Sequence, residues 1–166
     1  MTEEPVFVLN ASVFIEAARR YYAFDLAPKF WELLIEHAAN GRIRSIDRIK
    51  DELERGKDQL ASWSNSHFSD NFISTDDEDI VKCYGQIITW VQAQGQFSDA
   101  AKHGFAGGAD GWLVAYAKAK GCVVVTQEIL SPDIKRKVPI PNVCRAFNLQ
   151  FVDTFDMLRK LRVRWS

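Results

Sequence analysis

Residues 122–126 are the sequence feature that most constrains the fold. They form a short run of apolar, mostly β-branched residues directly after Gly121. A run without polar alternation is typical of a strand buried on both faces, as in a parallel sheet. Residues 6–9 form a second such run, and residues 42–46 and 150–152 are weaker strand candidates.

Stretches with helical periodicity lie between these strand candidates. The clearest begins at an apparent capping box, Thr75 with Glu78, and carries apolar residues at positions 80, 84, 87, 88 and 91. The other predicted helices are one capped by Ser12, one from Pro28 to Asn40, and those at residues 47–53, 60–63, 100–101, 109–120, 143–147 and 154–161, the last capped by Asp153. Residues 64–67 and 69–71 are predicted as loop. Strands alternating with helices predict an α/β fold, a three-layer α/β/α sandwich around a central, mostly parallel sheet of four to five strands.

Composition fits one globular domain over residues 1–166. Apolar residues make up 47% of the chain and charged residues 26%, and the net charge is −1. The N-terminus lacks the features of a signal peptide, and no apolar run approaches the roughly 18 residues of a membrane span, so we expect a cytoplasmic protein. Three widely spaced cysteines are expected to be reduced core thiols.

Four positions of acidic type fall where the loops of such a sheet would gather them. Asn10 and Glu128 follow the two clearest strands, whereas Glu52 and Asp110 lie in predicted helices. Working sites of open parallel sheets lie outside the carboxyl ends of the strands. Carboxylates that converge there usually need a divalent cation, which suits metal-assisted cleavage of a phosphodiester.

Each of the four positions also has an ordinary interpretation. Asp110 could simply satisfy backbone amides at a helix N-terminus, and Asn10 could end a strand in a turn. Glu52 and Glu128 could be solvated residues of a helix and a turn. The functional hypothesis depends on all four occurring together.

Four short motifs in this order resemble the PIN domain family of ribonucleases, which includes toxins of bacterial toxin–antitoxin pairs. The motifs are Val8-Leu9-Asn10-Ala11-Ser12-Val13-Phe14-Ile15, Asp51-Glu52-Leu53, Ala109-Asp110-Gly111-Trp112-Leu113-Val114-Ala115 and Val124-Val125-Thr126-Gln127-Glu128. Trp31 and residues 140–144 and 153–158 are similar to the corresponding parts of a poorly characterised bacterial branch of the PIN-like superfamily.

The resemblance implies a metal-dependent endoribonuclease. Asn10, Glu52, Asp110 and Glu128 would occupy the catalytic and metal-binding positions, with Mg²⁺ or Mn²⁺ as the ion and RNA as the substrate. Ser12 and Thr126 would support the site by hydrogen-bonding metal-bound water or orienting a carboxylate. An antitoxin partner and a homodimer are also implied.

Asn10 departs from the family pattern, which has its most central aspartate at this position. An amide offers one neutral oxygen and no negative charge, so metal affinity and water activation are expected to fall. Either an aspartate has been changed to its near-isostere to silence a nuclease, or the protein is naturally degenerate. We favour the first interpretation because drift would be expected to erode more than one of the four positions.

Nucleic-acid contacts are predicted for the basic loop Lys135-Arg136-Lys137, with Phe105 and Trp112 as candidate stacking residues. Buried aromatic residues of a helix are more often core. The glycine-rich residues 104–108 lack the Lys-Ser/Thr of a P-loop and are expected to form a flexible approach to the site.

The main hypothesis is therefore a PIN-type endoribonuclease toxin in an inactive or weakened form. The alternative is a non-catalytic PIN-like module that binds RNA or a protein partner. A phosphate-receiver domain is excluded because the chain lacks its acidic pair after the first strand and its lysine after the last.

Overall fold

A five-stranded parallel sheet forms the centre of the protein, whose computed structural model describes residues 4–164. The strands are β1 Phe7–Leu9, β2 Ile43–Ile46, β3 Phe72–Ile73, β4 Val123–Val125 and β5 Phe151–Val152. Their order is β3-β2-β1-β4-β5, and all four pairings are parallel. The predicted α/β fold with a parallel sheet of four to five strands is confirmed.

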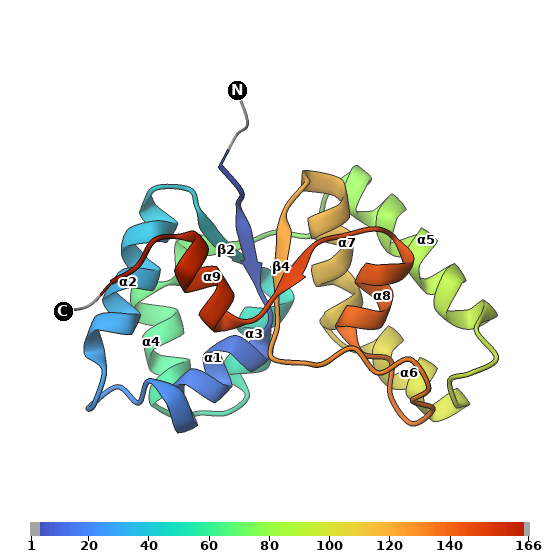
Figure 1. Ribbon diagram of the computed structural model, residues 1–166, viewed down its shortest axis with the longest axis horizontal. Coiled ribbons are helices and arrows are strands. Elements are labelled where there is room, and N and C mark those ends of the chain that lie inside the picture. The colour runs from blue at the N-terminus through green and yellow to red at the C-terminus, as the bar shows by residue number, and fades with distance from the viewer. Residues whose placement is uncertain (1–3, 165–166) are drawn as a thin grey trace.

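Helices cover both faces of the sheet. The helical segments of residues 4–164 are α1 Ala11–Glu16, η1 Ala17–Tyr21, α2 Pro28–Ala39, α3 Asp47–Glu54, α4 Gln59–His67, η2 Ser69–Asn71, α5 Glu78–Ala93, α6 Asp99–Gly107, α7 Asp110–Lys120, α8 Ile140–Ala146 and α9 Thr154–Lys160. Figure 1 shows α1, α2, α4 and α9 on one side of the strands and α5, α6, α7 and α8 on the other. This is the three-layer arrangement that right-handed crossovers between parallel strands produce.

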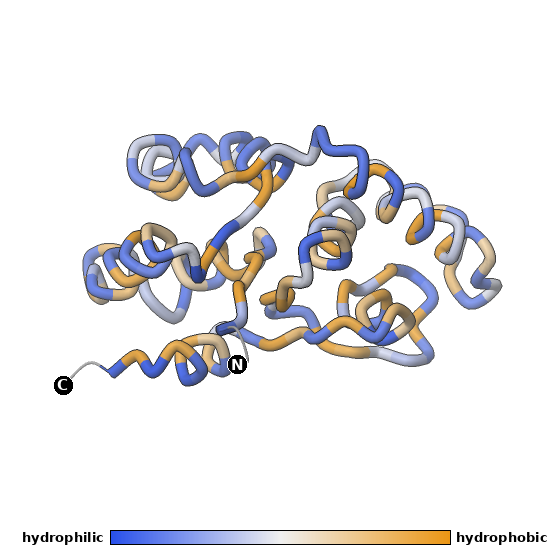
Figure 2. The backbone as a smooth tube through the Cα atoms, turned by 90° about the horizontal axis from the view of Figure 1, so that it is seen from above, coloured by the Kyte–Doolittle hydropathy of each residue, from blue (hydrophilic) through white to orange (hydrophobic). Residues whose placement is uncertain are grey.

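The core consists of the strands and the inner faces of the helices. All residues of β1 and β4 are buried, as expected for strands covered on both faces. Figure 2 shows hydrophobic and hydrophilic residues alternating along the coiled helices, as expected of helices with one buried face. An aromatic cluster on one side of the sheet joins α1, α2 and α4 to β3; its members are Phe14, Trp31, Trp63, Phe68 and Phe72.

Two predicted helix caps are wrong. Asn10 rather than Ser12 caps α1, because its Oδ1 accepts a hydrogen bond of 2.8 Å from the Ala11 amide. Asp77 rather than Thr75 caps α5. Thr75 is buried instead, and its hydroxyl donates to Asp47 Oδ1 at 2.9 Å, so a tertiary partner replaces the local one.

Several predicted loops are also wrong. Residues 64–67 belong to α4, where the buried Ser64 hydroxyl donates to the Ala61 carbonyl at 2.9 Å. The glycine-rich segment is largely helical, because α6 continues to Gly107 rather than stopping near Ala101. The strand β3 has no counterpart among the predicted strands.

Two further predictions concern the cysteines and the membrane. Cys83, Cys122 and Cys144 are free; the last two are buried and Cys83 is half-buried. Within residues 4–164, every helix is too short or too polar to cross a membrane.

Candidate active site

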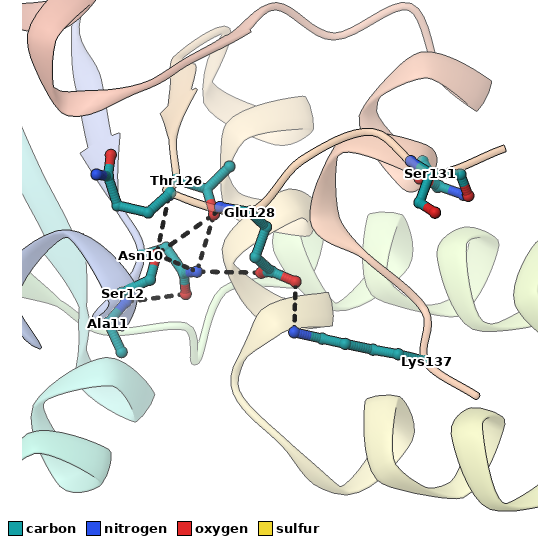
Figure 3. A network of polar contacts seen from close by, with 9 residues as sticks. Asn10, Ala11, Ser12, Thr126, Glu128, Ser131 and Lys137 are labelled. Atoms are coloured by element: carbon teal, nitrogen blue, oxygen red, sulfur yellow. Dashed lines mark hydrogen bonds and ion pairs between the residues drawn. The ribbon is translucent and has the colours of Figure 1, made fainter. Parts of the chain in front are cut away.

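The parallel register of β1 and β4 sets the position of the site. Leu9 pairs with Val125, and the Asn10 amide donates to the Val125 carbonyl at 2.9 Å. The residues that follow the two strands, Asn10 and Thr126, therefore emerge side by side at the carboxyl edge of the sheet (Figure 3).

Asn10 lies at the centre of a polar network and is only 3% exposed. Its Nδ2 lies 3.1 Å from both Ser12 Oγ and Thr126 Oγ1, and 3.3 Å from Glu128 Oε2. An amide nitrogen carries two hydrogens, so these three acceptors share two donors. Because Oδ1 caps α1, the amide hydrogens are the part of Asn10 that faces the site (Figure 3).

Ser12 and Thr126 hold the loop that follows β4. The Gln127 amide donates to Ser12 Oγ at 3.0 Å, and the Glu128 amide donates to Thr126 Oγ1 at 3.1 Å. The two hydroxyls lie 3.4 Å apart. They thereby fix the position of the Glu128 backbone relative to Asn10.

Glu128 forms an ion pair with the basic loop. Lys137 Nζ lies 2.8 Å from Glu128 Oε1, and the exposed fractions of the two side chains are 55% and 14%. Glu128 Oε1 is buried, and the Lys137 ammonium is its partner. Figure 3 shows Asn10 and Lys137 reaching Glu128 from two directions, one at each carboxylate oxygen.

Asp110 is half-buried at the first position of α7. Burial, followed by the nearby charges of Glu128 and Glu52, raises the pKa of this carboxyl from 3.8 to about 7, and the Lys137 ammonium opposes the shift. A carboxyl group with such a pKa holds its proton through much of the acidic range. Strongly shifted pKa values concentrate at functional sites.

Glu52 completes the acidic cluster from α3. Its side chain is exposed, yet partial desolvation raises its pKa, which the Arg55 guanidinium lowers and the Glu128 carboxylate raises further. Each of the three carboxyl groups thus acts electrostatically on at least one of the others. The structure brings Asn10, Glu52, Asp110 and Glu128 to one region at the end of the sheet.

Gly111 allows the close packing behind Asp110. A Cβ at this position would lie 3.1 Å from both the Phe105 and Tyr84 rings. Tyr84 stacks on Trp112 with ring centroids 3.8 Å apart, and the Arg48 guanidinium lies 4.1 Å from the Trp112 centroid. Phe105 is buried and Trp112 is covered in this way, which favours the alternative interpretation of both rings as core residues.

The basic loop lies beside the acidic cluster. Arg136 and Lys137 line a pocket of about 240 Å³ together with Asp110 and the glycine at position 104 of α6. Lys135 does not line it, although its carbonyl anchors the loop by accepting a hydrogen bond of 2.8 Å from the Ser98 amide.

Two arginines near the site were not among the predicted residues. Arg48 and Arg55 line a smaller pocket of about 100 Å³ with Glu52 and the glycines that precede α7. Their spacing from Glu52, four residues before and three after, would place all three on one face of a helix. That spacing is a signal from which sequence analysis could have found them.

The carboxyl groups of the acidic cluster are of a chemical type that binds divalent ions, but the side-chain orientation of Asn10 does not suit such an ion. Carboxylates are the ligands that Mg²⁺ and Mn²⁺ prefer, and the buried Glu128 Oε1 already has a cation, the Lys137 ammonium, as its partner. Asn10, however, turns N–H groups rather than an oxygen toward the site. Across residues 4–164, no group of three or more His, Cys, Asp or Glu side chains lies ready to hold a metal ion.

Several solved structures share this fold. The chain is similar to VapBC2 from Rickettsia felis, bound to a DNA fragment from their promoter, with a TM-score of 0.56, 17% identity and coverage of 89% of this chain and 98% of that chain. It is similar to FitAcB from Neisseria gonorrhoeae, with a TM-score of 0.55, 18% identity and coverage of 88% and 96%. It is also similar to VapBC-1 from nontypeable Haemophilus influenzae, with a TM-score of 0.53, 15% identity and coverage of 89% and 97%.

These similarities define the class of protein as one with a PIN-like fold, which confirms the predicted resemblance at the level of the fold. No curated protein matches the chain in sequence. The chain belongs to the family described as "Domain of unknown function (DUF4411)", whose model matches residues 7–165.

Proposed function

We propose that the protein is a PIN-type, metal-dependent endoribonuclease of a toxin–antitoxin pair, in a form that Asn10 weakens or silences. The observation that carries the proposal is the distance of 3.3 Å between Asn10 Nδ2 and Glu128 Oε2. An aspartate at position 10 would bring a second anionic oxygen toward Glu128. Two carboxylates so close together require a cation or a shared proton.

The ion would be held by Asp110, Glu128 and Glu52, and more weakly by Asn10. Mg²⁺ or Mn²⁺ would activate a water molecule for attack on an RNA phosphate and neutralise the charge that develops there. In this proposal Ser12 and Thr126 fix the backbone of Glu128 and thereby orient its carboxylate.

RNA would follow the basic residues on either side of the carboxylates. Arg136 and Lys137 line one pocket with Asp110, and Arg48 and Arg55 line another with Glu52. Arginine and lysine supply the phosphate contacts that dominate the affinity of proteins for nucleic acids. Cationic groups beside an acidic cluster would draw the polyanion toward it despite the net charge of −1.

An antitoxin protein is the proposed partner. The three structures compared above are of toxin–antitoxin complexes, which supports such a pairing and a homodimer of this chain. Co-purification of the chain with the product of the adjacent gene, followed by determination of the mass of the complex, would test both parts of this proposal.

One observation favours a second candidate function, a non-catalytic module that binds RNA or a protein partner. Asn10 and Lys137 engage both oxygens of Glu128, so the acidic cluster is stabilised by groups of the chain itself. A site stabilised in this way has no need of a metal ion to fold.

Cleavage of a single-stranded RNA in the presence of Mn²⁺ distinguishes the two functions. We expect the Asn10→Asp variant to cleave RNA about tenfold to a hundredfold faster than the unchanged chain. Residues that only support metal ligands already affect activity to this extent. The double variant Asn10→Asp/Asp110→Asn serves as the control and should lose the gain. A folded Asn10→Asp variant that neither binds Mn²⁺ nor cleaves RNA would favour the binding module.

A further inference from the structure

Lys137 is the group of the basic loop that reaches into the acidic cluster. Its Nζ lies 2.8 Å from Glu128 Oε1, although most of the Lys137 side chain remains in solvent. The same ammonium also lowers the pKa of the neighbouring Asp110 carboxyl. Lys137 therefore acts on two of the three carboxylates of the site.

The backbone around Lys137 is fixed on both sides. Gln96 Nε2 donates to the Pro132 and Ile134 carbonyls at 2.6 and 2.7 Å, and the Ser98 amide donates to the Lys135 carbonyl at 2.8 Å. Val138, directly after Lys137, is 2% exposed. These contacts fix the backbone from which the Lys137 side chain extends, and more than half of that side chain is exposed.

We propose that Lys137 is an internal counter-ion of the acidic cluster and that a divalent ion must displace its ammonium from Glu128 in order to bind. This inference rests on the proposed function, since it concerns the same carboxylates. It assigns Lys137 a role in setting metal affinity, which differs from the phosphate contact predicted for the basic loop.

Electrostatics supports a competition between the two cations. An ammonium and a divalent ion at one carboxylate repel each other strongly in a partly buried site, where the effective dielectric constant is well below that of water. Oε1 is the Glu128 oxygen that Lys137 contacts, so it is the oxygen for which the two cations would compete. Because the Lys137 side chain is more than half exposed, its release into water costs little.

Calorimetric titration with Mn²⁺ tests the inference in the chain that carries Asn10→Asp. We expect Lys137→Met in this background to bind Mn²⁺ about threefold to tenfold more tightly than the Asn10→Asp parent. The gain is of this size because the ion pair that competes with the metal is partly exposed and therefore weak. Lys135→Met is the matched control, because it removes the same charge from the same loop but has no contact with Glu128, and it should change the affinity much less. Lys137→Arg keeps the positive charge and should keep the weaker affinity.

Unfolding temperatures measured in a chelator supply a second readout. Lys137→Met should unfold at a lower temperature than Lys135→Met, and added Mn²⁺ should raise its unfolding temperature more. Equal Mn²⁺ affinities for the Lys137→Met and Lys135→Met variants would overturn the inference. If the Asn10→Asp parent nevertheless cleaved RNA, the proposed function would remain intact. Absence of Mn²⁺ binding in all variants would overturn both.

Discussion

Asn10 and Glu128 meet through a hydrogen bond of 3.3 Å between Nδ2 and Oε2, although 118 residues separate them in the sequence. The bond joins the ends of β1 and β4, the two strands at the centre of the fold. The residue type at position 10 determines whether this contact is attractive or repulsive. With an amide at position 10 the contact is attractive, and with a carboxylate it would be repulsive unless a cation or a proton lay between the two groups.

The first prediction concerns stability in the absence of divalent ions. Asn10→Asp should lower the free energy of unfolding by about 1–3 kcal/mol in a chelator, because a buried hydrogen bond is lost and a like charge is added. Mn²⁺ should restore much of that loss. Urea unfolding with and without the ion measures the effect. The exposed substitution Asn65→Asp should show neither the loss nor the recovery.

The second prediction concerns pH. The folded protein holds the Asp110 proton up to a pKa of about 7, whereas the ordinary value is 3.8, so between these values the native state binds more protons than the unfolded state. The contribution of Asp110 to stability should therefore be complete below about pH 4 and should be lost as the pH rises through 7. The free energy of unfolding, measured by chemical unfolding across this pH range, should decline less steeply with pH in Asp110→Asn than in the unchanged chain. An unchanged slope would argue against the shifted pKa, and the exposed Asp133→Asn serves as the control.

The third prediction concerns the glycine after Asp110. Gly111→Ala should destabilise the protein by about 1–3 kcal/mol, because its Cβ would lie 3.1 Å from the rings of Phe105 and Tyr84 in a tightly packed region. Gly85→Ala in α5 has no atom within 4 Å of the new Cβ and should stabilise its helix by about 0.5–1 kcal/mol. Thermal unfolding of the two variants should therefore shift in opposite directions.

The fourth prediction concerns the pocket beside the basic loop. A Cβ at Gly104 meets no atom within 4 Å, so Gly104→Leu should fill the pocket without disturbing α6. We expect the affinity for a single-stranded RNA, measured by fluorescence anisotropy in a chelator, to fall about tenfold, which is a loss of about 1.4 kcal/mol. Gly85→Leu is the control, because Gly85 is an equally open position in α5 and does not line this pocket. Equal RNA affinities for the two leucine variants would exclude the pocket as part of the RNA path.

The main strands and helices could be predicted because their signals are local. The unbroken apolar run of β4 and the regular spacing in α5 depend only on nearby residues, and both elements occur as predicted. Strand β3 was not predicted, because its two residues directly follow the polar residues 69–71, whose composition is typical of a loop. The cap of α5 was wrong because Thr75 finds its partner at Asp47, which is 28 residues away.

The residues of the candidate site differ in how they could be predicted from the sequence. Asn10 and Glu128 were accessible to reasoning about topology, since both follow strands of a parallel sheet. Glu52 and Asp110 came from the family resemblance, because nothing in a helical pattern marks one carboxylate among many. No local pattern predicts the Lys137–Glu128 ion pair or the cation–π contact of Arg48 with Trp112, because both form only in the folded chain.

The most direct test of the account is the anomalous difference density of Mn²⁺ in crystals of the Asn10→Asp variant. The account predicts a peak between the carboxylate introduced at position 10, Asp110 and Glu128, with the Lys137 ammonium displaced from Glu128. Fully soaked crystals with no peak at this end of the sheet, or with Mn²⁺ bound only elsewhere, would contradict it.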